Sequence, residues 1–151
     1  MQMIFYVVMG IIVVGVIAMF VISAMTPRPD NIGVTNGKLA PVPDSPNCVS
    51  TEATDDLHRI EPYMFSGSAE DAVRKLKSIV SAMAGSNIVS EDGSYLHAEF
   101  RSRIFRFVDD VEFLVTAEDG LVHFRSASRV GHSDLGVNRA RMEAIRKQFQ
   151  Q

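Results

Sequence analysis

The side chains best suited to chemistry in this sequence are arginines that alternate with apolar or small residues along predicted strands. Successive side chains of a strand point to opposite faces, so the alternation gathers the charged residues on one face of a sheet. We expect that face to be exposed and to carry His97, Glu99, Arg101, Arg103, Glu112, His123, Arg125 and Arg129. Guanidinium groups bind carboxylate or phosphate through two parallel hydrogen bonds. The pattern therefore predicts a non-catalytic binding module for an anionic small molecule, a lipid head group or a protein partner.

Arg125 and Arg129 would form the centre of this site, beside a helix predicted to start at Ser133-Asp134. Free amides at a helix start favour anions, although the Asp134 carboxylate already occupies that favourable field. The alternative is an ordinary solvated face, on which cross-strand ion pairs of roughly a few tenths of a kcal/mol keep the sheet soluble. A second copy could also close such a face, so the sequence leaves the oligomeric state open.

Asp109, Asp110 and Glu112 form the one tight acidic group of the chain. Paired carboxylates act as general acid and base or hold a hard cation, which makes an acid/base enzyme an alternative function. A turn at 108–110 or ion pairs to the arginines would explain the same residues without catalysis. The four histidines show no metal-ligand spacing, so no metal is predicted, and no nucleotide or nucleophile motif indicates a cofactor. The sequence leaves enzymatic activity open and favours its absence.

The single cysteine, Cys48, cannot form an internal disulfide. No histidine lies near it in sequence to serve as a base, so a structural role is favoured over a nucleophilic one.

The run from Met3 to Met25 contains no charged side chain over 23 positions. As a helix it would reach about 35 Å, against a hydrocarbon core of roughly 30 Å. It lacks the basic start of a signal peptide and exceeds the usual length of its apolar region. We therefore predict a single-pass anchor in contact with membrane lipid (1–26), a Pro-rich tether (27–50) and one soluble domain (51–151).

All 15 Lys and Arg and all 18 Asp and Glu lie beyond this anchor, so the net charge of −3 belongs to the soluble part. That balance argues against a nucleic-acid partner. The nearest cations, Arg28 and Lys38, lie on the C-terminal side of the anchor, which by itself favours a cytoplasmic domain.

Periodicity and turn signals predict the elements of the soluble part. They indicate an edge strand within 58–65, a helix from Ser68 to Gly85, strands near 88–91, 95–105, 111–117 and 121–130, and a C-terminal helix from Ser133-Asp134. The last helix carries the stripe Leu135, Asn138, Met142, Ile145 and Phe149. The fold class is α+β: a transmembrane helix, then an antiparallel sheet of four to five strands with two helices packed on one face.

Three segments go beyond periodicity: LAPVPDSPNCVS at 39–50, FRSRIFRFVDDVEF at 100–113 and FRSASRVGHSDLGVNRARMEAIR at 124–146. Together they resemble the domain of unknown function 1499 family of bacteria and plastid-bearing eukaryotes, which has no assigned activity. The family pattern falls on Pro46, Asn47, Cys48, Asp109, Asp110, Glu112, Arg125, Ser126, Ser128, Arg129, Gly131, Asp134, Gly136, Asn138 and Arg139.

With this resemblance the predicted ligand-binding residues are Arg125, Arg129, Arg101, Arg103, Ser128, Asn138 and Arg139. Asn138 has an alternative role, because an amide on a docked helical stripe is more often a satisfied core group. The other motif residues have an alternative role as well. In a structural or assembly protein they would only join the last strand to the last helix.

Many relatives carry a second cysteine about where Val42 stands, and a cysteine pair there would suit an oxidising compartment. The resemblance therefore favours a domain on the outer, periplasmic side of the membrane, against the charge argument. In this chain no such bond can form.

Overall fold

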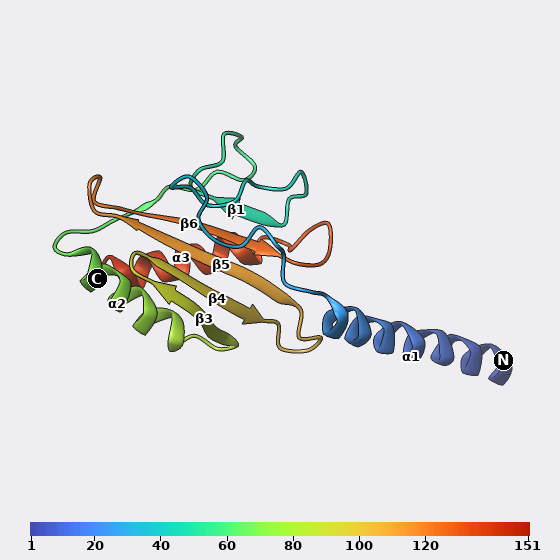
Figure 1. Cartoon of the computed structure of the whole chain (residues 1–151). Helices are drawn as coiled ribbons and strands as arrows, with labels where there is room; N and C mark the ends of the chain where they lie inside the picture. The colour runs from blue at the N-terminus through green and yellow to red at the C-terminus, as the bar shows by residue number, and fades with distance from the viewer.

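An apolar helix, α1 (Gln2–Met25), projects from one end of the computed structural model, which describes residues 1–151 (Figure 1). Its 24 residues carry no charged side chain and none of them is buried. A helix of that length extends about 36 Å, so α1 is long and apolar enough to cross a bilayer.

The sheet contains six antiparallel strands. Five follow the order β1-β6-β5-β4-β3, and the sixth, β2, pairs with the other end of β6 from β1. Their bounds are β1 (Cys48–Ser50), β2 (Tyr63–Met64), β3 (Ser86–Asp92), β4 (Tyr95–Arg101), β5 (Val108–Thr116) and β6 (Leu121–Ser128). Short connections join β3 to β6 in sequence order, which forces antiparallel neighbours. The predicted α+β class is confirmed, and the predicted edge strand within 58–65 is reduced to Tyr63 and Met64.

Two helices, α2 (Ala69–Ser81) and α3 (Val137–Phe149), cover one face of this sheet (Figure 1). The Ser68 hydroxyl accepts a hydrogen bond from the Asp71 amide at 3.1 Å, which caps α2 as predicted. Most of the alternate strand residues that face the helices are apolar. The core between the layers includes Leu76, Val80, Phe113, Phe124, Met142 and Ile145, all buried.

The predicted strand 95–105 is too long, and the predicted turn at 108–110 is wrong. β4 ends at Arg101, residues 102–107 form the connection, and β5 already begins at Val108. Asp109 and Asp110 are therefore strand residues, paired with Phe100 and Glu99. Ile104, which alternation along the predicted strand would place on the same face as Phe100, is 69% exposed in the connection. Ser102 accepts a hydrogen bond from the Phe107 amide at 2.9 Å, so local side-chain bonding ends the strand early.

The C-terminal helix begins later than predicted, at Val137, and β6 ends at Ser128 rather than at Val130. Leu135 and Gly136 have positive φ values of 55° and 79°, which no α-helix contains, so the helix cannot start before them. Leu135 is 93% exposed and does not belong to the buried stripe, whereas the other four predicted stripe residues are buried. The Asp134 carboxylate accepts the Asn138 amide at 2.7 Å, which satisfies one of the free amides in the first turn of α3.

The Pro-rich segment 27–50 packs on the sheet face opposite the helices and supplies β1 at its end (Figure 1). Its buried residues include Leu39 and Asn47. The Gly33 amide donates to the Glu112 carboxylate at 2.7 Å, and the Ser128 amide donates to the Asn47 carbonyl at 3.0 Å. Segment 27–50 therefore forms part of the soluble body, as a cover over the sheet.

Candidate functional site

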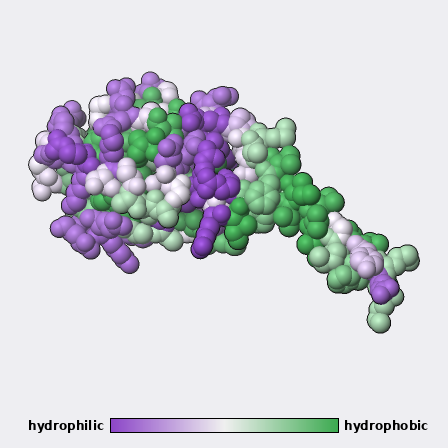
Figure 2. Space-filling model, turned by 90° about the horizontal axis from the view of Figure 1, so that it is seen from below, coloured by the Kyte–Doolittle hydropathy of each residue, from purple (hydrophilic) through white to green (hydrophobic).

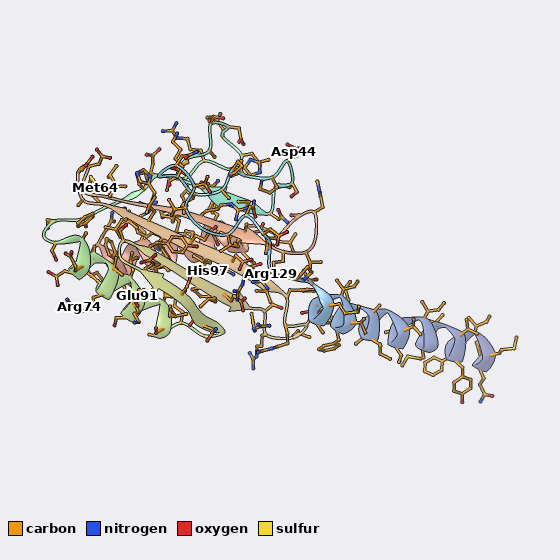
Figure 3. All side chains as sticks on the ribbon, in the orientation of Figure 1. Asp44, Met64, Arg74, Glu91, His97 and Arg129 are labelled. Carbon is orange, nitrogen blue, oxygen red and sulfur yellow. The ribbon has the colours of Figure 1, made fainter.

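The charged face of the sheet is buried, and the prediction that it is exposed is wrong. His97, Glu99, Asp110, Glu112 and Arg125 each retain 6% or less of their accessible surface. Alternation correctly put His97, Glu99, Glu112 and Arg125 on one face, but segment 27–50 covers that face. We call these residues together with Asp110, Arg129 and Tyr95 the charged cluster; Figure 3 labels two of its members, His97 and Arg129, which lie close together over the sheet.

Arg129 holds two carboxylates that would otherwise repel each other. Glu99 and Asp110 lie directly opposite on β4 and β5, and like charges in that position are destabilising. The Arg129 guanidinium donates to both Asp110 oxygens, from Nε and Nη2 at 2.7 Å each, and Nη2 also donates to Glu99 Oε1 at 2.6 Å. These bonds raise the pKa of Arg129, so its charge is permanent.

The pKa values of both carboxylates are lowered. Burial alone would raise the pKa of Asp110, but hydrogen bonds from Arg129 and His97 outweigh it. His97 Nε2 lies 2.9 Å from Asp110 Oδ1 and must carry the proton, because a carboxylate only accepts. Burial likewise opposes the lowered pKa of Glu99, which results from hydrogen bonds from Arg129 and Arg28.

Glu99 also joins the cluster to the end of α1. Arg28, three residues beyond Met25, donates from Nη2 to Glu99 Oε1 at 3.0 Å. Arg101, a predicted ligand-binding residue, donates to Glu99 Oε2 at 2.9 Å and is partly exposed. Each of these contacts attaches a more exposed cation to the edge of the cluster.

Glu112 lies at the fully buried end of the cluster. It accepts hydrogen bonds from the Tyr95 hydroxyl at 2.8 Å and from the Gly33 amide at 2.7 Å. Burial and the adjacent Glu112 charge raise the pKa of Tyr95, so its hydroxyl remains a donor. The Glu112 oxygen that faces Arg125 is 3.4 Å from Arg125 Nη1, which is long for a charge-assisted bond.

Arg125 consequently has unused hydrogen-bonding capacity. Its Nε atom is buried and has no hydrogen-bond partner, and its bond to Glu112 is the one side-chain hydrogen bond that its guanidinium makes. Arg129 uses the same Nε and Nη2 edge to bind both oxygens of Asp110. Arg125 therefore presents an unoccupied edge of the kind that binds an oxyanion through two bonds.

Arg125 also lines a polar cavity of about 290 Å³, which lies between segment 27–50 and the sheet. It is lined by Pro29, Asn31, Pro43, Ser45, Asn47, Asp110, Arg125, Ala127, Ser128, Arg129 and Gly131. Three predicted ligand-binding residues, Arg125, Arg129 and Ser128, thus meet in one cavity. Arg103 does not join them, because it lies in the exposed connection 102–107.

Asn138 and Arg139 are engaged by the protein on the helix side of the sheet. The Asn138 side chain accepts from the Ser126 hydroxyl at 2.6 Å and donates to the Asn47 carbonyl and the Ser128 hydroxyl, each at 3.0 Å. Asn138 is a satisfied core amide. Arg139 donates to the carbonyls of Arg59 and Leu57, both at 2.9 Å, and so holds the loop before β2.

The predicted acidic cluster is divided between the two faces. Asp110 and Glu112 belong to the charged cluster, whereas Asp109 lies on the helix side, 2.5 Å from Arg141 Nη2. Its carboxylate therefore cannot act with the other two on one substrate group. No group of three or more His, Cys, Asp or Glu residues is placed to hold a metal ion.

Cys48 is buried on β1, and burial raises the pKa of its thiol to about 11. A thiol with that pKa is protonated at neutral pH and is a poor nucleophile.

Sequence reasoning missed Arg28, Tyr95 and Arg141 as partners of the acidic residues. Tyr95 carries the signal of alternation, because it shares a face with His97 and Glu99. Arg28 and Arg141 give no local signal, since their partners lie 71 and 32 residues away.

Fold and site together define a small α+β domain with a buried charged cluster, joined to an apolar N-terminal helix. The family model of proteins of unknown function DUF1499 matches residues 38–149, and the chain belongs to this family. The match begins in the segment that covers the sheet, ten residues before β1. No curated protein and no solved structure matches the chain.

Proposed function

We propose that this protein is a membrane-anchored binding module, and that it holds a small hydrophilic oxyanion against Arg125. The observation that carries the proposal is the unused edge of a buried guanidinium at the wall of a polar cavity. Buried polar atoms without a partner are rare in native proteins and call for an explanation such as an absent ligand.

The charge around the cavity supports an anion. Arg125 and Arg129 line it, and Asp110 is the one acidic residue that does. Both Asp110 oxygens already accept bonds from Arg129, which offsets the Asp110 charge. Glu112 offsets Arg125 less completely, because one long bond of 3.4 Å joins them. Ala127 and two prolines are its least polar lining residues, which favours a carboxylate, phosphate or sulfate group on a small polar molecule over an acyl chain.

A binding titration of the full chain in detergent micelles tests this proposal. Inorganic phosphate, sulfate and small dicarboxylates are the probes, with thermal unfolding as the readout. At 100 times its dissociation constant a ligand adds about 2.7 kcal/mol to the free energy of unfolding. Arg125→Gln should abolish the response, and Arg125→Lys should weaken it because an ammonium group cannot bind bidentately.

Arg74→Gln provides the matched control, since Arg74 is exposed at the end of the domain away from α1 (Figure 3). The proposal fails if no oxyanion raises the unfolding temperature, or if Arg125→Gln responds like the parent protein.

We further propose that α1 is an uncleaved anchor and that the domain lies on the outer side of the membrane, as the family resemblance implies. Cys48 is too deeply buried to report its side by labelling. A cysteine at exposed Glu118 (Glu118→Cys) should react with a membrane-impermeant maleimide in intact cells. Labelling only after lysis would place the domain inside.

A further inference from the structure

The connection between β4 and β5, residues 102–107, lies against α1 and carries arginines that the charged cluster does not use. The Phe105 ring packs edge-to-face on the Phe20 ring of α1, with 5.4 Å between their centroids. Figure 1 shows this connection at the end of the sheet that adjoins α1. A loop of the soluble domain thus touches a residue inside the apolar helix.

The position of Phe20 in α1 sets the depth of this contact. A hydrocarbon core of about 30 Å takes up about 20 helical residues, so its boundary falls about two residues inside each end of a centred α1. Phe20 precedes Met25 by five residues and would lie about 4–5 Å below that boundary. A loop in contact with Phe20 then sits where lipid head groups meet acyl chains.

The composition of the loop suits that depth. Ile104 is 69% exposed at its tip, and Phe105 lies between exposed Arg103 and Arg106, which make no salt bridge or side-chain hydrogen bond. The Ser102 amide donates to the Phe107 carbonyl at 2.8 Å, which closes the base of the loop and directs its tip outward. In Figure 2 the hydrophobic surface of α1 continues onto the adjoining end of the domain.

We propose that residues 102–107 form a membrane-docking loop, in which Ile104 and Phe105 enter the interface of an anionic bilayer while Arg103 and Arg106 bind lipid phosphates. The inference rests on the proposed role of α1 as an anchor. Apolar tips flanked by arginines bind such interfaces through buried area and attraction to anionic lipid. Docking would fix the orientation of the whole domain, because Arg28 also holds the end of α1 against Glu99.

Single tryptophans test the docking loop, because the chain contains no tryptophan. Full-length Ile104→Trp is reconstituted into vesicles of phosphatidylcholine with or without phosphatidylglycerol, with lipids brominated along their acyl chains as quenchers. Met64→Trp is the matched control, since Met64 is 71% exposed and lies at the end of the domain away from α1 (Figure 3). Ile12→Trp, in the middle of α1, reports insertion of the anchor itself.

Ile104→Trp should show blue-shifted emission and quenching in anionic vesicles, and Met64→Trp neither. An arginine beside an anionic surface changes the ratio of docked to undocked protein about fivefold, so removing two lowers it about 30-fold. We therefore expect Arg103→Gln with Arg106→Asn to abolish most of the quenching of Ile104→Trp. Asparagine is chosen because Arg106 has a φ of 62°, which asparagine adopts readily. Arg74→Gln with Lys75→Gln is the control for charge, because it removes two positive charges near Met64. It should leave the quenching of Ile104→Trp unchanged.

If Ile12→Trp is quenched and Ile104→Trp is not, the proposal that residues 102–107 dock on the membrane is wrong, and the proposal that α1 is an anchor is unaffected. Unquenched Ile12→Trp would overturn both. Equal quenching of Ile104→Trp with and without phosphatidylglycerol would overturn the role of the arginines.

Discussion

Replacing Arg129 by methionine should destabilise the domain strongly, because it removes the cation that separates two buried carboxylates. Arg129 donates three bonds of 2.6–2.7 Å to Glu99 and Asp110, and the three side chains retain 6%, 6% and 2% exposure. Removing one partner of a buried ion pair typically costs about 3–5 kcal/mol. Glu99 keeps Arg28 and Arg101, so most of the penalty falls on Asp110, whose remaining partner is His97.

The penalty should depend on pH in a defined direction. In the parent protein the pKa of Asp110 is lowered, so its contribution to stability is full above the unfolded pKa of about 4 and is lost as the pH falls through the folded value. Without Arg129, burial raises the pKa of Asp110, and the variant then gains stability as the carboxylate is protonated. The difference between parent and variant should therefore be largest near pH 7 and shrink towards pH 4.

Urea unfolding of the full chain in micelles, followed by near-ultraviolet circular dichroism of Tyr63 and Tyr95, measures this difference. Arg74→Met is the control: its side chain is 75% exposed and its pair with Asp71 should be worth less than about 1 kcal/mol. Asp110→Asn should recover part of the loss in the Arg129→Met background, since it removes the buried carboxylate that has lost its cation. A loss at pH 7 no greater than that of Arg74→Met, or one equal at pH 7 and pH 4, would refute the reasoning.

Three further predictions concern stability and reactivity. Asn138→Ala should lower the free energy of unfolding by about 2–3 kcal/mol in urea titration, because the Ser126 hydroxyl and the Asn47 carbonyl lose a buried partner. A loss smaller than that caused by a substitution at an exposed residue would contradict the role of Asn138 as a core amide. Cys48 should resist maleimide at pH 7 until the protein is unfolded, given its burial and its pKa of about 11; rapid labelling of the folded protein would show that β1 opens. A fragment that starts at Thr51 lacks β1 and the cover over the charged cluster, so it should unfold at a clearly lower temperature than one that starts at Pro27; equal unfolding temperatures would mean that segment 27–50 does not stabilise the sheet.

Local pattern was sufficient to predict most of the elements and both faces of the sheet. Alternation assigned Ala98 and Phe100 to the core and His97 and Glu99 to the other face, and the structure agrees. The Ser68 cap and the buried positions of α3 from Asn138 onward follow from helical spacing in the same way. These features depend on neighbours within a few residues, which a single sequence displays.

The burial of the charged face was not predictable from such neighbours. The cover is a Pro-rich segment with no periodicity, and its contacts with the sheet span large separations: Gly33 to Glu112 is 79 residues, and Arg28 to Glu99 is 71. Composition marked the segment as a tether because proline and glycine disfavour regular elements. Packing of an irregular segment is decided by long-range contacts, which periodicity does not encode.

One route from the anchor to the cavity passes through the Glu99 side chain. It binds Arg28 at the end of α1, Arg101 beside the proposed docking loop, and Arg129, whose other contacts fix Asp110 at the cavity. Any change in how α1 leaves the membrane would alter the Arg28 contact, and the remaining Glu99 bonds would transmit that change towards Arg129. If both proposals hold, Glu99→Gln should weaken oxyanion binding at Arg125 without contacting the ligand. Binding unchanged in Glu99→Gln, at unchanged fold, would show that Glu99 does not couple the anchor to the cavity.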